Sequence, residues 1–198
     1  MHQNKITMRF LAFTIALFFN LHAFAQKPCD FTVNVTDSLG TYKSTKEYLV
    51  YEKIFGGKSS YVFNSIIIAD GTPTLNFQLI EKSSGFIKVK CFDNNSKIFI
   101  QLNNGKIVTL LHVDKGSCGT MVRDDKGVNN RITTGYFMFK KDDFQELKKS
   151  PISYIRVKYS AETEDFIFRK AFKSEMDGLI YEPENYFINY FHCLEDKN

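Results

Sequence analysis

The stretch from Phe86 to Val113 limits the possible folds most, because it holds three short runs of β-forming residues. The runs are FIKVKCF (86–92), KIFIQL (97–102) and KIVTLLHV (106–113), and the first two alternate apolar and polar side chains. Such alternation is typical of strands with one buried face. The turn sequences DNNS (93–96) and NNG (103–105) separate the runs. The Asn-Gly step favours a type I′ hairpin, whose two central residues must accept positive φ. The stretch therefore predicts a three-stranded antiparallel meander.

Further segments rich in β-forming residues occur on both sides of the meander. They span 47–55, 61–69, 74–82, 131–139, 152–159 and 164–170, and DFTVNV (30–35) suits a leading edge strand. Residues 116–130 are polar and contain glycines, which predicts a long loop.

Two segments predict helices. A short helix is expected near 142–149, where Asp142 or Asp143 would cap the start and Ser150-Pro151 would end the helix. A C-terminal helix is expected near 183–195, with Pro183 at a favoured first position. One stripe of this helix, made of Phe187, Phe191 and Leu194, would pack on a sheet.

About eight to ten short strands with two helices define a mainly β (α+β) protein. We expect an antiparallel β-sandwich or a strongly curved sheet. A lipocalin-like β-barrel is the alternative, because such barrels also carry a helix on the outside. The two differ in consequence: a sandwich fills its interior with side chains, whereas a barrel can keep a ligand cavity.

The N-terminus predicts export. Lys5 and Arg9 precede an apolar run from Phe10, and Ala23-Phe24-Ala25 provides the small residues of a signal-peptidase site. Residues 1–25 are thus a predicted secretory signal peptide, and residues 26–198 have the size of one β-rich domain. No later segment is long and apolar enough to span a bilayer. We expect a periplasmic or extracellular protein.

Four cysteines remain after this cleavage, namely Cys29, Cys91, Cys118 and Cys193. An even count in an exported domain indicates two disulfides, and four cysteines allow three pairings. Because domain termini often lie close together, we favour Cys29–Cys193 with Cys91–Cys118. No C-x-x-C or H-x-x-x-H spacing occurs, so neither a metal site nor a cofactor is predicted.

The motif KGSCGT (115–120) raises the question of a cysteine nucleophile at Cys118. A trypsin-like site would need a histidine and an aspartate on a preceding barrel. The only histidine between Gln26 and Cys118 is His112, which lies just six residues before Cys118, and this stretch is too short to form a whole preceding barrel. A papain-like site would use His192 as base and would place the cysteine at the start of a helix, but residues 119–130 resemble a loop. We therefore expect a disulfide rather than a nucleophile at this motif.

Carboxylates are the remaining candidates for acid–base chemistry. The acidic clusters are Asp124-Asp125, Asp142-Asp143 and Glu162 to Asp165, and the last fits a solvated hairpin turn. A glycosidase needs two carboxylates facing each other across a cleft, which these clusters do not establish. We assign no catalytic residue.

Binding features are equally modest. The net charge is +4, and two of those positive charges leave with the signal peptide, which gives +2 and argues against nucleic acid as a partner. Trp is absent, so a glycan platform would depend on Tyr, of which Tyr42, Tyr48, Tyr51 and Tyr61 lie in the first third. The polar loop supplies a candidate interaction surface. Its members are Ser117, Arg123, Asp124, Asp125, Asn129 and Asn130.

The order of these signals resembles small, uncharacterised exported β-rich proteins of Gram-negative bacteria. The features that carry the resemblance are Cys29-Asp30-Phe31, the LxNGxxxxL pattern from Leu102, DxFxxLxxSPIxxIRVxY from Asp142 and the terminal Cys193-Leu194. The resemblance implies an exported β-rich domain and no assigned activity.

The sequence thus predicts an exported non-catalytic domain with a binding or envelope-associated structural role, and an envelope protein or a glycan as partner. A barrel-type carrier of a small ligand is one alternative, and a small hydrolase using carboxylates or Cys118 is another.

Overall fold

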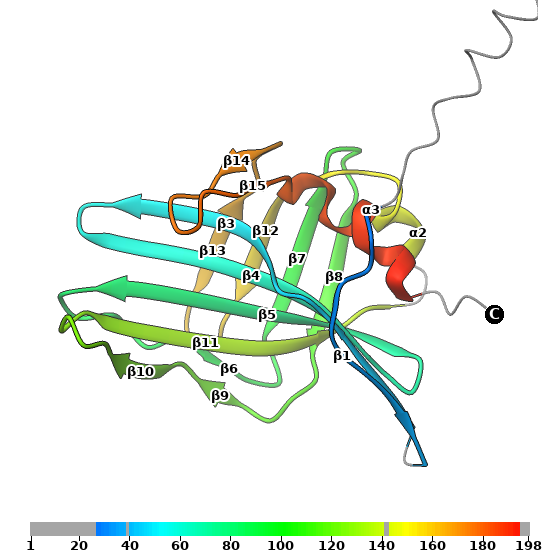
Figure 1. The fold of residues 1–198 in the computed structure, drawn as a ribbon, viewed down its shortest axis with the longest axis horizontal. Coiled ribbons are helices and arrows are strands. Elements are labelled where there is room, and N and C mark those ends of the chain that lie inside the picture. The colour runs from blue at the N-terminus through cyan, green and yellow to red at the C-terminus, as the bar shows by residue number, and fades with distance from the viewer. Residues whose placement is uncertain (1–26, 39, 141–142, 195–198) are drawn as a thin grey trace, which may run out of the picture.

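The described residues are built around one antiparallel sheet of 11 strands (Figure 1). The computed structural model describes residues 27–38, 40–140 and 143–194, so the predicted signal peptide lies outside the described residues. The strands are β1 (Phe31–Asp37), β2 (Gly40–Thr45), β3 (Tyr48–Phe55), β4 (Lys58–Ala69), β5 (Thr72–Ser83), β7 (Lys97–Leu102), β8 (Ile107–His112), β10 (Thr120–Arg123), β11 (Asn129–Met138), β12 (Ile152–Lys158) and β13 (Thr163–Ile167). Their order is β1-β2-β4-β5-β11-β8-β7-β12-β13, with β3 also on β4 and β10 also on β11.

The sheet bends back over itself, so that β3, β4, β5 and β11 cross in front of β8, β7, β12 and β13 (Figure 1). Buried side chains of both halves form one core between them, including Phe77, Phe137, Ile100 and Phe166. The edge strands β3 and β13 approach through the rings of Tyr51 and Phe166, whose centroids lie 5.1 Å apart. No backbone pairing joins β3 to β13 in the described part of the chain. The sandwich or curved-sheet prediction is confirmed, and the closed-barrel alternative is wrong.

β2 and β3 pair with successive parts of the same edge of β4, and a buried hydroxyl fills the gap in hydrogen bonding between them. β2 pairs with β4 up to Ser44–Ile67, and β3 takes over at Tyr48–Asn64. Between them the amide of Ile66 has no strand partner and donates instead to Thr45 Oγ1 at 2.9 Å. Because Thr45 is only 4% exposed, its hydroxyl replaces a bond that water cannot supply.

The predicted meander is only partly correct. β7 and β8 form the expected hairpin, but the two residues of β6 (Cys91–Phe92) pair with β9 (Ser117–Cys118) and not with β7. Residues 86–90 form no strand. Phe92 instead packs on β11 over Gly135, where an added Cβ would lie 2.7 Å from the phenyl ring. Core packing of one aromatic side chain has outweighed the local alternation.

The hairpin turn also differs from the prediction. Gly105 donates its amide to Leu102 O, and Leu102 donates to Lys106 O. Gly105 has φ 87°, whereas Asp70 is the one non-glycine residue with positive φ in the described ranges. Asn104 therefore does not adopt the type I′ conformation. Residues 102–105 form a turn whose last residue, Gly105, is left-handed. This is the three-residue hairpin loop with a bulge.

The loop predicted over 116–130 is largely strand. It contains β9 and β10, and Asn129 and Asn130 begin β11. β10 pairs with β11 from Thr120–Ile132 to Arg123–Asn129, so the true turn covers only residues 124–128. The turn residues were recognised, but the β-forming residues of 120–123 were not.

The helices are shorter than predicted. α2 spans Phe144–Leu147, and Asp143 stands at its N-cap without a side-chain cap bond, while Asp142 lies outside the described residues. The C-terminal segment contains 3-10 turns η2 (Pro183–Asn185) and η3 (Phe191–Leu194) around α3 (Tyr186–Tyr190). Phe187 and Phe191 are buried as expected. The two-stranded unit β14 (Phe172–Lys173) and β15 (Ile180–Tyr181) was not predicted. Within the described residues, no helix is long and apolar enough to cross a bilayer.

Candidate functional site

Both predicted disulfides are present, which decides the role of KGSCGT. Cys29 is bonded to Cys193 and Cys91 to Cys118, and the described residues contain no free cysteine. The amide of Gly119, which a protease would use in its oxyanion hole, donates to Lys90 O at 3.0 Å. In this disulfide-bonded state Cys118 carries no thiol that could act as a nucleophile.

The residues of the predicted interaction loop mostly serve local structure. Asp124 Oδ1 accepts from the amides of Lys126 and Val128 and so closes the β10–β11 turn. These bonds lower the pKa of the Asp124 carboxyl, chiefly the one from Val128. Ser117, Arg123, Asn129 and Asn130 donate from their side chains to Thr134 O, Gly127 O, Gly85 O and Val128 O, respectively. Asp125 is exposed. The loop is ordered by its own polar groups, and a recognition role for it stays a prediction.

The predicted tyrosines do not form one platform. Tyr61 is buried, and the rings of Tyr48 and Tyr51 pack on Tyr186 and Phe166. Tyr42 is 43% exposed and lines a separate shallow depression between β1, β2 and the β4–β5 turn. An aromatic platform therefore has to be sought elsewhere on the sheet.

A groove of about 180 Å³ crosses the outer face of β8, β7 and β12. We call it the outer groove, and its lining residues are Phe99, Gln101, Ile107, Tyr154 and Arg156. The strand alternation puts them outside, because Ile98, Ile100, Ile155 and Val157 fill the core from the opposite face. Cross-strand register fixes their spacing: Gln101 is paired with both Ile107 and Tyr154, and Phe99 with Arg156.

Arg156, one of the residues that line the outer groove, is held in an ion pair with Asp165 at its border. Arg156 Nε and Nη2 donate to the two carboxylate oxygens of Asp165, each at 2.7 Å. This bidentate bond lowers the pKa of the Asp165 carboxyl and raises the pKa of the guanidinium. The guanidinium carbon lies 5.9 Å from the centroid of Tyr154. The planar group is therefore held beside an aromatic ring, with both partners accessible to solvent.

The outer groove combines apolar surface with a few oriented polar groups. Phe99 and Tyr154 are half-buried and Ile107 is 61% exposed. Gln101, Arg156 and Asp165 offer donors and acceptors at the edge. Its volume is below the roughly 300–1,000 Å³ of sites for drug-sized ligands. The groove suits one ring-sized group of a longer ligand that lies along the sheet.

A second polar feature lies on the inner face, where the alternation of β5 continues beyond the core. Lys90 Nζ contacts Glu81 Oε1 at 2.7 Å and Glu164 Oε2 at 3.0 Å. We call Glu81, Lys90 and Glu164 the inner ion cluster. The side chains of Lys90 and Glu81 are 9% and 18% exposed, and that of Glu164 is 36% exposed.

Burial is the largest single effect on the pKa values of Glu164 and Lys90, but it decides the direction of the shift only for Glu164. It raises the pKa of Glu164, although the ammonium of Lys90 opposes this. For Lys90 the two carboxylates outweigh burial, so its pKa is raised and the ammonium is the stable form. Beside the cluster, the buried hydroxyl of Tyr159 has no hydrogen-bond partner among the described residues, and burial and the nearby carboxylates raise its pKa well above the ordinary value. Because Lys90 stands between the carboxylates, they are arranged as an ion cluster rather than as a pair facing an open cleft.

Sequence reasoning did not find these groups. Glu164 lies in a strand, β13, as the predicted segment 164–170 implies, but its carboxylate reaches Lys90 and does not lie in a solvated turn. The signal that was available is in β5, where the inward series Leu75, Phe77 and Leu79 continues to Glu81. An acid at the next inward position requires a cation, but sequence gives no means of choosing Lys90.

The two histidines occupy different surroundings. His112 is 9% exposed and stacks on Phe92 at 5.4 Å between ring centroids, and burial lowers its pKa. His192 precedes Cys193, and its Nε2 lies 3.2 Å from Cys29 Sγ. Neither histidine lines the outer groove or belongs to the inner ion cluster.

Comparison with protein-family models, with curated proteins and with solved structures finds no match to this chain. The geometry of the chain itself is therefore the basis for assigning a function.

Proposed function

We propose that the protein is an exported, non-catalytic binding domain whose outer groove binds a carbohydrate. The observation that carries the proposal is the outer groove itself, in which Phe99 and Tyr154 lie beside the fixed Arg156–Asp165 pair. A sugar ring has an apolar face of C–H groups and a rim of hydroxyls. The aromatic side chains suit the face, and Gln101, Arg156 and Asp165 suit the hydroxyls.

The surroundings of the outer groove support a binding role without catalysis. Its strands are backed by a packed core, so the side chains are held by a rigid scaffold. No carboxylate lines the outer groove in the described part of the chain, and Asp165, which borders it, is already bonded to Arg156. A glycosidase would need a second carboxylate across the bond to be cleaved.

The filled interior favours this surface site over a carrier function. Phe77, Phe92, Phe137 and Phe166 meet between the two halves of the sheet, with ring centroids 5.3–6.4 Å apart for the contacting pairs. A ligand carrier needs this space for its ligand. Export is supported by the two disulfides, because such bonds persist in oxidising compartments.

A glycan array followed by calorimetry with the best soluble oligosaccharide tests the proposal. Tyr154→Ala should weaken binding at least tenfold, and Arg156→Gln should do so by releasing Asp165. Phe86→Ala is the matched control, because Phe86 is 80% exposed on a different segment. The control should leave the affinity unchanged. The proposal fails if no glycan binds, or if Tyr154→Ala and Phe86→Ala bind equally well.

A further inference from the structure

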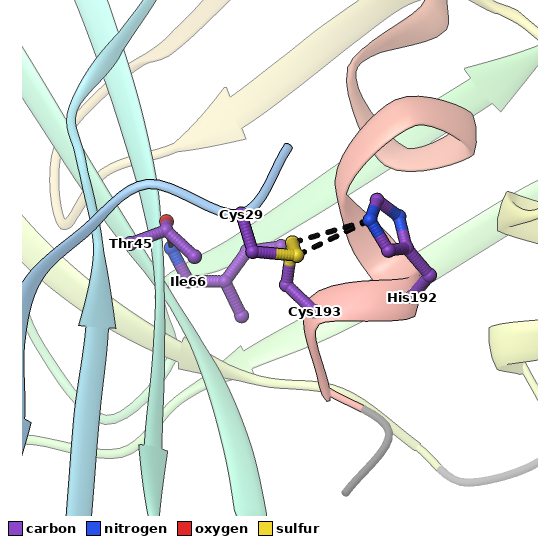
Figure 2. The surroundings of a disulfide bond; sticks show 5 residues. All are labelled: Cys29, Thr45, Ile66, His192 and Cys193. Carbon is purple, nitrogen blue, oxygen red and sulfur yellow. Dashed lines mark hydrogen bonds between the residues drawn. A yellow bond between two sulfur atoms is a disulfide. The ribbon is translucent and has the colours of Figure 1, made fainter. Parts of the chain in front are cut away.

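A potential metal-ligand group lies where the two ends of the described chain meet, and it shares no residue with the outer groove. Cys29, His192 and Cys193 each offer one ligand atom, and these atoms all lie within 4.8 Å of one another. His192 Nε2 lies 3.2 Å from Cys29 Sγ and 3.8 Å from Cys193 Sγ. Figure 2 shows the imidazole pointing at both sulfurs of the disulfide. The described residues hold no other group of this kind.

The segments that bear these residues are held in place independently of the disulfide. On one side, Phe187 and Phe191 are each 1% exposed and anchor the C-terminal helical segment in the core. On the other side, Lys46 N donates to Asp30 O at 2.8 Å, and Lys27 Nζ pairs with Glu182 at 2.5 Å. Cleavage of the sulfur–sulfur bond would therefore leave all three side chains close together.

We propose that reduction of the Cys29–Cys193 disulfide creates a Zn²⁺ site formed by Cys29, Cys193 and His192. A dithiol reductant supplies two electrons and two protons, becomes a disulfide itself and leaves two protein thiols. Binding of Zn²⁺ then releases the two thiol protons, and the neutral imidazole coordinates through Nε2. Two thiolates and one imidazole are a known type of zinc ligand set, in which water takes the fourth position.

The geometry of the site permits this change. Zinc bonds of about 2.3 Å at a tetrahedral angle separate two thiolate sulfurs by about 3.8 Å. The Cα atoms of Cys29 and Cys193 are 5.6 Å apart, so rotation about the Cα–Cβ bonds can provide that separation. His192 Nε2 faces the sulfurs and is therefore the nitrogen placed to coordinate the metal.

The Cys29–Cys193 site would link the two chain ends in both redox states, but by a different bond in each. In an oxidising compartment the disulfide forms the link, and where a reductant is present zinc replaces it. Cys91–Cys118 belongs to no group of three potential metal ligands among the described residues, so it should remain a structural bond only. The inference does not depend on carbohydrate binding.

Cobalt binding tests the proposal, because Co²⁺ in a thiolate site absorbs visible light. The Cys91→Ala/Cys118→Ala chain, reduced with a phosphine, should bind one Co²⁺ that Zn²⁺ displaces, and the oxidised chain should bind none. His192→Gln should lower the affinity at least tenfold. The proposal is overturned if the reduced chain binds no Co²⁺, or if His192→Gln binds it as tightly.

A measurement on the unmodified chain tests the assignment without substituting any cysteine. The reduced protein is alkylated with iodoacetamide with and without Zn²⁺, and the modified cysteines are mapped by mass. Zinc should protect Cys29 and Cys193 and leave Cys91 and Cys118 reactive. Equal protection of all four cysteines, or of none, would refute the assignment.

Discussion

Removal of the Lys90 ammonium tests whether the inner ion cluster stabilises the fold. In Lys90→Met the aliphatic stem is retained, but Glu81 and Glu164 lose the cation that lies 2.7 and 3.0 Å from their oxygens. Breaking a buried ion pair by removing one partner costs about 3–5 kcal/mol, because the other charge is left uncompensated. Since Glu164 is 36% exposed and partly screened, we expect a loss near the lower end, about 3 kcal/mol at pH 7.

The pH dependence of this loss identifies its cause. Burial already raises the pKa of Glu164, and Lys90 opposes that shift, so the variant should raise the pKa further. A carboxyl whose folded pKa exceeds its unfolded value destabilises the fold only while it is ionised. The deficit of Lys90→Met should therefore be largest at pH 7 and should shrink as the pH falls toward 4.

Urea unfolding monitored by far-ultraviolet circular dichroism at pH 7 and pH 4 measures both effects, since the chain lacks Trp. Lys88→Met is the matched control, because Lys88 pairs with Glu162 but is 64% exposed. Its loss should stay below about 1 kcal/mol. Adding Glu81→Gln and Glu164→Gln to Lys90→Met should restore most of the stability. A deficit below about 1 kcal/mol, or one that does not change with pH, would refute the electrostatic explanation.

Three other substitutions address separate parts of the fold. Thr45→Val removes the acceptor of the Ile66 amide and should cost about 1–3 kcal/mol in urea unfolding, whereas Thr45→Ser should retain most of the stability. The Cys29–Cys193 disulfide closes a loop of 164 residues, and its loss should lower the free energy of unfolding by about 5 kcal/mol. The Cys91–Cys118 disulfide closes a loop of 27 residues, and its loss should lower it by about 3.5 kcal/mol. A reversed order of the two losses would contradict the loop-entropy explanation. Burial lowers the pKa of His112, so the unfolded chain takes up the proton first and stability falls as the pH drops below about 6.5. His112→Gln should flatten the urea midpoint between pH 7 and pH 5, and an unchanged slope would show that other groups cause it.

Local pattern was sufficient for most strands because one face of each is buried. The predicted segments 61–69 and 74–82 lie within β4 and β5, the segment 131–139 extends one residue beyond the end of β11, and both disulfide pairings are confirmed. The strand at 86–92 was wrong because its alternation competes with long-range packing. The β10 strand was missed because its four exposed residues carry no burial signal.

The sites could not be predicted because their members are far apart in sequence. Lys90 meets acids that are 9 and 74 residues away, and no local spacing encodes such a meeting. The outer groove joins residues of three strands, and its pairing Phe99–Arg156 depends on the register between β7 and β12. Register follows from the inward series of both strands once their pairing is known. The pairing itself is a property of the whole sheet.

Gly135 shows how that long-range packing can be measured. The rings of Phe92 and Phe137 lie within 3 Å of the position of an added Cβ, so Gly135→Ala should displace Phe92 and cost about 1–3 kcal/mol by overpacking. Phe92 also stacks on His112 and Tyr159, so its displacement would affect both halves of the sheet. Phe92→Leu alone should be destabilising, but with Gly135→Ala the combined loss should be smaller than the sum of the two, because leucine leaves room for the new methyl group. Urea unfolding of the four chains gives the coupling energy of this double-mutant cycle. Additive losses would mean that Phe92 does not depend on the glycine, and that another interaction holds residues 86–92 away from β7.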